Sequence, residues 1–188
     1  YSIFVDQNEK VWVGSAYTGI SSFDGVEWHN HFEFFGEIQG SRIYDVCPVD
    51  DSKVWFGTNE GISIKDGTTW QYYDIFNSIL KSNNITSIAN ENEDNYWITN
   101  SIGGLYYYNG SELVDYTNTN TIFIDEVLEV VEVNGSKVWV GTYGEGAAVY
   151  NGTSWTNYDK NNSALTSNFI RSFYFDNAEN KWEMGNNK

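Results

Sequence analysis

The 188-residue sequence contains one cysteine, one proline and only 10 lysine and arginine residues, against 26 aspartate and glutamate residues. Its single cysteine, Cys47, cannot form an internal disulfide, so the chain is not a disulfide-stapled scaffold. Nucleic acids and anionic membrane surfaces require a basic face, which a chain with a formal net charge of -16 does not offer. The composition therefore argues against these partners and leaves uncharged or cationic ligands open.

Long apolar runs are also missing. No stretch approaches the roughly 18 apolar residues of a membrane-spanning helix, so we expect no direct membrane insertion of this segment. Disorder is excluded, because 8 tryptophans, 14 tyrosines and 11 phenylalanines provide far more buriable surface than a disordered acidic chain carries. The sequence starts at Tyr1 without a secretory signal pattern, so any targeting signal has been removed or lies outside it.

What the sequence does contain is internal repetition with a period of 42 or 43 residues. Two series of mostly tryptophan and two series of glycine share this period. The first series is Trp12, Trp55, Trp97, Trp139 and Trp182, the second is Trp28, Trp70, Leu113 and Trp155, and the glycines are Gly19, Gly61, Gly104 and Gly146, then Gly25, Gly67, Gly110 and Gly152. Four series with one period do not arise by chance, so the repeat decides the architecture.

Each repeat is predicted to form four short β-strands, and no segment shows a sustained helical period. The third strand of each ends in Asp-Gly or Asn-Gly, dipeptides that supply positive φ in tight hairpin turns. Four antiparallel strands in about 42 residues are typical of a β-propeller blade. We therefore predict an all-β chain with complete blades at residues 1–42, 43–84, 85–126 and 127–169 and part of a fifth at 170–188.

The number of blades favours a single propeller region, 1–188, that is a fragment of a larger ring. Known propellers close with about four to eight blades, and a closed four-bladed ring would leave residues 171–185 without a role. A four-bladed ring and a ring completed by another chain stay open as alternatives.

The repeat phrases resemble the two-component regulator propeller repeat. The pattern of that family is roughly Leu, any residue, Ser-Asn, a β-branched residue, an Asp-containing turn, Trp-Ile-Gly-Thr, Gly-Gly-Leu and an Asp-Gly turn. It is carried by residues 82–88, 95–99, 103–110, 151–158 and 162–168. Thr99-Asn100 in place of Gly-Thr and Leu113 in place of Trp depart from the pattern. The resemblance implies a periplasmic, cell-surface or secreted bacterial setting and a binding role, with polysaccharide fragments as one ligand class.

Candidate ligand residues are sought where the repeat is broken. In a propeller, the loop between second and third strands and the linker between blades emerge on one face, so non-repeating side chains there are the best candidates. They are Tyr17, Asn59, Glu60, Asn100, Tyr143 and Glu145 in the loops, with Arg42 and Lys81 in the linkers. The repeated tryptophans are expected to pack between blades, and Asn83 and Asn168 to cap the linker turns.

No catalytic residue, metal site or cofactor is predicted. His29 and His31 share one face of a predicted outer strand, but a third metal ligand, Glu27 or Glu33, is unproven. No nucleophile set or phosphate loop is present. The leading hypothesis is a non-catalytic recognition module for an oligosaccharide or peptide. A protein-docking scaffold in a secretion or adhesion assembly, and a propeller lyase or glycoside hydrolase, are the alternatives.

Overall fold

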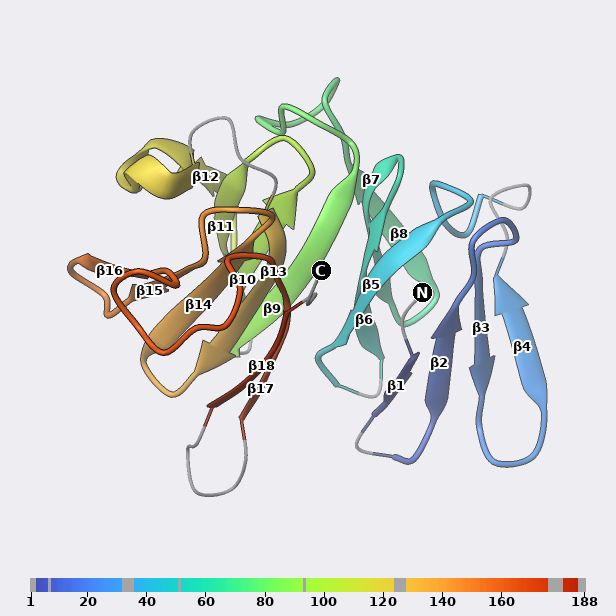
Figure 1. Ribbon diagram of the computed structural model, residues 1–188. Coiled ribbons are helices and arrows are strands. Elements are labelled where there is room, and N and C mark those ends of the chain that lie inside the picture. The colour runs from blue at the N-terminus through green and yellow to red at the C-terminus, as the bar shows by residue number, and fades with distance from the viewer. Residues whose placement is uncertain are drawn as a thin grey trace. The chain divides into compact units, whose positions relative to one another are not determined.

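The computed structural model describes residues 3–6, 8–31, 36–50, 52–92, 94–123, 128–175 and 181–185 (Figure 1). They form strands and turns, with short 3-10 helices at η2 (Thr117–Thr119) and η3 (Thr121–Phe123). No helix among these residues is long and apolar enough to cross a membrane.

The strands assemble into four antiparallel four-stranded sheets and one two-stranded sheet, each joined in sequence order by hairpins. The first sheet contains β1 (Ile3–Val5), β2 (Val11–Gly14), β3 (Ile20–Phe23) and β4 (Trp28–His31); the second contains β5 (Ile43–Pro48), β6 (Lys53–Thr58), β7 (Gly61–Asp66) and β8 (Thr69–Tyr73). The third contains β9 (Ile85–Asn92), β10 (Asn95–Asn100), β11 (Leu105–Asn109) and β12 (Leu113–Asp115); the fourth contains β13 (Leu128–Asn134), β14 (Lys137–Thr142), β15 (Ala147–Tyr150) and β16 (Trp155–Tyr158). The last pairs β17 (Ile170–Phe175) with β18 (Lys181–Gly185), as the blade prediction requires.

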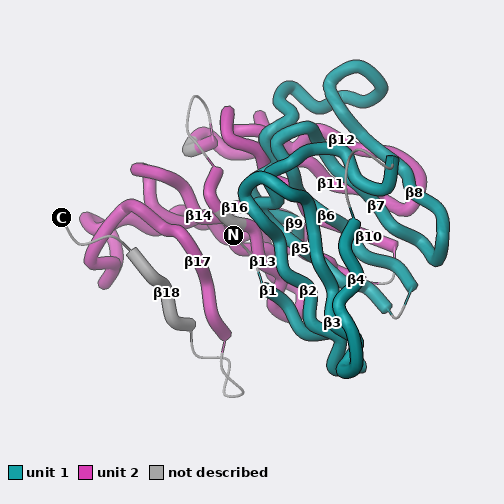
Figure 2. Tube along the Cα trace, turned by 90° about the vertical axis from the view of Figure 1, so that its right-hand side faces the viewer, with its two compact units in different colours: residues 1–88 teal, residues 89–188 magenta. Residues whose placement is uncertain are grey.

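The chain divides into two compact units, residues 1–88 and 89–188, with the boundary inside β9 (Figure 2). Unit 1 holds the first two sheets and the start of β9. Unit 2 holds the rest of the third sheet, the fourth sheet and the β17–β18 pair.

Central strands are buried on both faces and outer strands are not. In β6 every residue from Val54 to Thr58 is buried, whereas alternate residues of β4 are exposed. A strand between two layers of apolar side chains buries both faces, and an outer strand has one edge in solvent. The predicted hairpin turns are present: Gly152 has a φ of 89°, and Asn151 Oδ1 accepts the N–H groups of Thr153 and Ser154 at 3.0 and 2.9 Å.

The first tryptophan series lies in the cores. Trp12, Trp55, Trp97 and Trp139 are 2%, 0%, 3% and 6% exposed. The backbone of Trp182 belongs to β18, but its side chain lies outside the described residues.

The second series is divided. Trp70 and Trp155 pack against the cores of their units and Leu113 is buried, but Trp28 on β4 is 56% exposed. Among the described residues of unit 1 no second sheet covers Trp28, so its packing between blades stays a prediction.

Each core of this repeat combines one sheet with the next. In unit 1, Trp12 and Ile20 of the first sheet meet Val54, Phe56 and Trp70 of the second. In unit 2, the same positions are Trp97 and Leu105, which share a core with Val138, Val140 and Trp155. Equal spacing in the sequence thus becomes equal packing in space.

Candidate functional site

Backbone hydrogen bonds bring the loop between β2 and β3 against the linker that enters β5. The Gly19 N–H donates to the carbonyl of Ser41 at 3.4 Å, and the Ile43 N–H donates to the carbonyl of Ser15 at 3.0 Å. The loop between β6 and β7 joins them, because the Asn59 N–H donates to the carbonyl of Arg42 at 3.1 Å. Three segments that the sequence separates therefore meet at one edge of unit 1.

A pocket of about 240 Å³ opens where these segments meet. It is lined by Ala16, Tyr17, Arg42, Ile43 and Tyr44. The Arg42 guanidinium lies over the Tyr17 ring, 5.7 Å from its centroid, and Tyr17 is 75% exposed. We call this the Arg42 pocket. The guanidinium of Arg42 and the rings of Tyr17 and Tyr44 are its charged and aromatic lining groups.

Asn59 and Glu60 support the Arg42 pocket rather than line it. Asn59 Oδ1 accepts the Arg42 N–H at 2.8 Å, and Asn59 Nδ2 donates to Glu60 Oε1 at 3.3 Å. The Glu60 N–H donates to Thr58 Oγ1 at 2.9 Å. Four of the predicted residues, Tyr17, Arg42, Asn59 and Glu60, are thus brought together.

A β-bulge after Ile43 places Tyr44 at the pocket, a residue that sequence reasoning missed. The pairing of β5 with β6 shifts between Ile43 and Asp45, and such a bulge re-aims the side chain at that point. Asp45 fixes the bulge: its carboxylate accepts N–H groups from Val46 and Ile88 at 2.9 and 2.7 Å. Burial raises the pKa of Asp45, opposed by these bonds and by the Ser87 hydroxyl.

The corresponding bulges in unit 2 carry charged side chains. β13 and β17 are irregular after Leu128 and Ile170, at the same repeat position. Arg171 lies 5.6 Å from the centroid of Tyr143 and 4.0 Å from Glu129 Oε2. The position of Tyr44, Glu129 and Arg171 is recognised as non-repeating from the repeat period together with the bulge. The sequence shows the period but not the bulge.

Tyr143 and Glu145 lie in the loop between β14 and β15. The Tyr143 ring packs edge-on against Phe169 at 5.0 Å, and both rings are partly exposed. Glu145 is exposed, and its N–H donates to Thr142 Oγ1 at 2.9 Å. These two predicted residues therefore belong to unit 2 and to a different loop from the Arg42 pocket.

Asn100 is a loop anchor, which corrects its assignment as a ligand residue. Its side chain is fully buried, and its Oδ1 accepts the Gly104 N–H at 2.8 Å and the Ile102 N–H at 3.3 Å. A buried amide that bonds its own loop does not face a ligand. Lys81 is exposed in the linker before β9 and is not among the residues that line the Arg42 pocket.

Asn83 and Asn168 cap linker turns, as expected. Asn83 Oδ1 accepts the Ile75 N–H at 2.9 Å, and Asn168 Oδ1 accepts the Lys160 N–H at 2.8 Å. Their carbonyls accept the N–H groups of Gly61 and Gly146.

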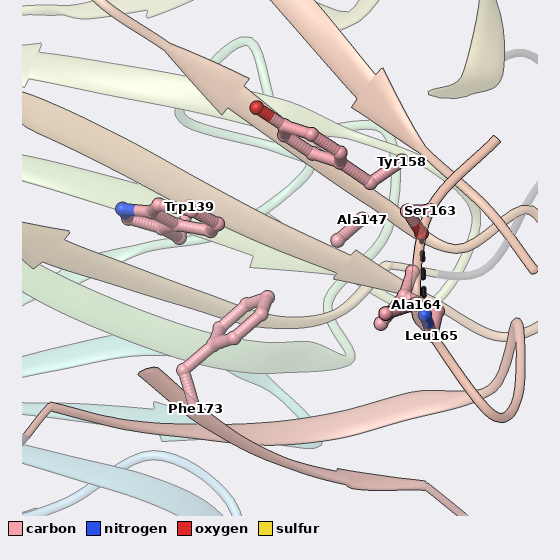
Figure 3. Close-up of a pocket in the computed structure, with 7 residues that line it drawn as sticks. All are labelled: Trp139, Ala147, Tyr158, Ser163, Ala164, Leu165 and Phe173. Atoms are coloured by element: carbon pink, nitrogen blue, oxygen red, sulfur yellow. Dashed lines mark hydrogen bonds between the residues drawn. The ribbon is translucent and has the colours of Figure 1, made fainter. Parts of the chain in front are cut away.

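An apolar pocket of about 170 Å³ in unit 2 is a packing feature (Figure 3). Its lining residues are Trp139, Ala147, Tyr158, Ser163, Ala164, Leu165 and Phe173. Trp139, Ala147 and Leu165 occupy the repeat positions of Trp12, Ile20 and Ile38 in the unit 1 core.

In the other two cores a fourth-strand tryptophan fills the equivalent position. Trp70 stacks on Phe56 at 5.8 Å in unit 1, and Trp155 meets Phe123 at 5.0 Å in unit 2. The pocket of Figure 3 is therefore the space that a following fourth strand occupies elsewhere in this repeat. Its chemistry is that of a core, with no charged lining residue.

The two histidines do not share a metal site among the described residues. His29 Nε2 lies 2.8 Å from Asp24 Oδ2, and Asp24, Glu27 and His29 cluster at an exposed hairpin. Hydrogen bonds from the Glu27 N–H, then from His29 and the Val26 N–H, lower the pKa of Asp24, which is the behaviour of a turn-capping carboxylate. His31 instead packs against Trp12 at 6.1 Å. Glu33 lies outside the described residues.

Solved structures with the same fold include three informative neighbours. The extracellular domain of BT4673 from B. thetaiotaomicron, assigned to a one component system, superposes with a TM-score of 0.75 at 21% identity, covering 97% of this chain and 25% of that one. PorZ is an essential surface component of the type-IX secretion system of Porphyromonas gingivalis. It superposes with a TM-score of 0.70 at 18% sequence identity, covering 92% of this chain and 29% of PorZ. Virginiamycin B lyase from Staphylococcus aureus superposes with a TM-score of 0.78 at 13% sequence identity, covering 98% of this chain and 62% of the lyase chain.

These likenesses establish the fold: the chain has the β-propeller fold, and the prediction from the repeat is confirmed. The chain spans about a quarter of the length of the BT4673 domain. Extracellular domains of Bacteroides regulators among the neighbours agree with the resemblance to the two-component regulator propeller repeat. No protein-family model matches the chain, and no curated protein matches it in sequence.

Proposed function

We propose that the chain is part of a non-catalytic, extracytoplasmic recognition propeller that binds an oligosaccharide or a peptide on its loop face. The observation that carries the proposal is the Arg42 pocket, where non-repeating polar and aromatic side chains gather on a scaffold of repeated ones. Aromatic rings with a few convergent polar groups are the usual composition of a small-molecule site. The repeated tryptophans provide rigidity and the loops provide specificity.

The setting is proposed from the neighbours. The BT4673 and BT3049 structures are extracellular domains, and PorZ is a bacterial surface component. We place this chain outside the cytoplasmic membrane of a bacterium, as a periplasmic, cell-surface or secreted module.

A lyase function is less well supported. The neighbouring S. aureus lyase structure is of an inactive variant in which a histidine is replaced by alanine. The only histidines of this chain, His29 and His31, both lie on the outer strand β4, and neither lines the Arg42 pocket. The His31 ring packs between Trp12 and Trp70, with centroid distances of 6.1 and 5.9 Å.

The scaffold alternative is favoured by one observation, the likeness to PorZ. A scaffold predicts a protein footprint on the loop face or outer rim and no small ligand. The recognition module predicts a small ligand in solution. The two proposals therefore differ in what binds to the isolated propeller.

A glycan and peptide array separates them. The full-length protein that contains this chain is labelled and applied to immobilised oligosaccharides and peptides. We expect selective binding to one structural class, weakened by Tyr17→Ala. Uniform silence on both arrays, with a well-folded protein, would refute the recognition function. Turnover of a bound oligosaccharide, measured by product analysis, would refute the non-catalytic assignment.

A further inference from the structure

We propose that the Arg42 pocket binds a carboxylate-bearing sugar, a uronic acid residue of an acidic oligosaccharide. The proposal rests on the recognition function above and names its ligand class. Three features of the molecule support it: the unused donors of Arg42, the contrast with Arg171 and the aromatic walls.

The charged end of the Arg42 side chain has no ion-pair or hydrogen-bond partner among the described residues. Its backbone is held on both sides by Asn59, through the 2.8 and 3.1 Å hydrogen bonds. Within the described part of the chain, the guanidinium contacts the Tyr17 ring and forms neither an ion pair nor a hydrogen bond. A guanidinium carries five N–H donors in a planar fork that matches a carboxylate in a two-bond geometry. A fixed backbone and guanidinium N–H donors that are open to a ligand suit the binding of an anion.

The other arginine of the sequence provides the contrast. Arg171 also lies over a tyrosine, Tyr143, at nearly the same distance, but Glu129 Oε2 lies 4.0 Å from its guanidinium. Glu129 and Arg171 occupy one repeat position, the position of Tyr44, in successive repeats. Arg171 thus has a carboxylate partner, whereas no carboxylate lies within ion-pair distance of the Arg42 guanidinium in the described part of the chain.

The aromatic walls favour a sugar ring over a bare anion. Tyr17 and Tyr44 present broad apolar faces with polar edges, and such faces pack against the CH groups of a sugar ring. The Tyr44 hydroxyl lies 3.5 Å from Asn84 Oδ1, which orients the ring from its far end. The pocket of about 240 Å³ is smaller than the roughly 300 to 1,000 Å³ of sites for drug-sized ligands, so it suits one ring at a time.

The net charge of -16 does not prevent this binding. At physiological ionic strength, exposed charges farther away than about 8 Å are largely screened, so the nearest groups decide. The proposal thus departs from the uncharged or cationic ligands that the composition left open. A single exposed arginine on an acidic surface attracts an anion at that one place.

Isothermal titration of the full-length protein tests the proposal. The probes are oligosaccharides of galacturonic and glucuronic acid, their carboxyl-reduced counterparts, a sulfated neutral oligosaccharide and an acidic peptide. We expect a uronate to bind and its reduced counterpart to bind about tenfold more weakly, the effect of losing a hydrogen bond to a charged group. Arg42→Gln should cause a similar loss for the uronate and no change for the reduced sugar.

Two further variants make the result specific. Arg42→Lys keeps the charge but removes the fork, so it should lie between wild type and Arg42→Gln. Arg171→Gln removes an arginine that already has a carboxylate partner, and it should leave binding unchanged. Because Arg42 is exposed, its variants should keep the wild-type melting temperature, which circular dichroism verifies.

Each other outcome overturns the proposal in a distinct way. Equal binding of uronate and reduced sugar, unaffected by Arg42→Gln, refutes the anion and leaves the recognition function intact. Preference for the sulfated sugar or for the acidic peptide refutes the uronate. Absence of binding to every probe and to both arrays refutes the recognition function itself.

Discussion

At the scale of single residues, one repeat position shows how the same architecture accepts different chemistry. The fourth strand carries an aromatic residue three places after its tryptophan or leucine, namely Tyr73, Tyr116 and Tyr158, and His31 in the first sheet. His31 stacks on Trp12, and its Nε2 is buried without a hydrogen-bond partner among the described residues. Burial lowers its pKa below 6.5, an effect that Lys65 and Lys10 reinforce and Glu37 opposes.

This lowered pKa makes the stability depend on pH in a defined direction. Between pH 6.5 and the lower folded pKa, the unfolded chain binds a proton that the folded chain does not. The contribution of neutral His31 to the free energy of unfolding is therefore fully present above pH 6.5 and is lost as the pH falls toward the folded pKa. His31→Tyr, which restores the residue of the other repeats, should reduce this loss.

Urea unfolding at a series of pH values, for wild type and His31→Tyr, measures the difference. The control His29→Asn leaves His31 in place and should retain the decline that His31 causes. Identical pH profiles for wild type and His31→Tyr would contradict the assignment.

At the scale of elements, the loop between second and third strands depends on a glycine pressed against the neighbouring strand. A Cβ built on Gly146 would lie 2.1 Å from the carbonyl oxygen of Tyr158, and one on Gly61 would lie 2.2 Å from that of Tyr73. Their φ angles are 91° and 114°. Both the backbone angle and the space therefore require glycine.

Gly152 in the same unit separates the two requirements. Its φ of 89° nearly equals that of Gly146, but no atom lies within 4 Å of its Cβ position. Gly152→Ala should cost about 1 kcal/mol for the left-handed backbone alone. Gly146→Ala should cost about 2 kcal/mol more, because the carbonyl must move. Chemical denaturation measures both, and equal costs would show that the close approach relaxes freely.

At the scale of the molecule, a repeat protein builds each core from neighbouring sheets, so the quality of packing differs along the chain. The pocket of Figure 3 lies where the unit 2 repeat has Ala147 in place of an Ile or Leu. Ile20 and Leu105 fill the corresponding places in the other cores.

Ala147→Ile should therefore raise the stability of the 188-residue chain, since its described part contains no fourth strand after β18 to fill this pocket. The new side chain adds three carbon atoms to a space of about 170 Å³, and we expect a gain of about 1 kcal/mol after the loss of side-chain freedom. The neighbouring Ala148 is fully buried in a filled core, so Ala148→Ile should instead cost about 1 to 3 kcal/mol.

Thermal unfolding distinguishes the two variants, and a binding measurement on them tests the location of the ligand site. A ligand on the loop face should bind Ala147→Ile as tightly as wild type. Loss of binding in this variant alone would move the site to the apolar pocket.

The sequence by itself determined the repeat and most of the features that repetition produces. A period of 42 or 43 residues, Asp-Gly and Asn-Gly turns and alternating apolar strands are local properties, so they predicted the blades and the buried Trp12 series. The loops that hold Tyr17, Arg42 and Asn59 break the repeat, and their role in ligand binding stays a prediction.

The tertiary structure decided the rest, since these features depend on which distant segments touch. Burial of Asn100 and the bulge that places Tyr44 at the pocket have no signal within a few residues of the chain. Glu129 pairs with Arg171 across 42 residues, and nothing comparable meets Arg42 in the described part of the chain. The repeat is a property of the local sequence, but whether a charged side chain has a partner depends on which strands the fold brings together.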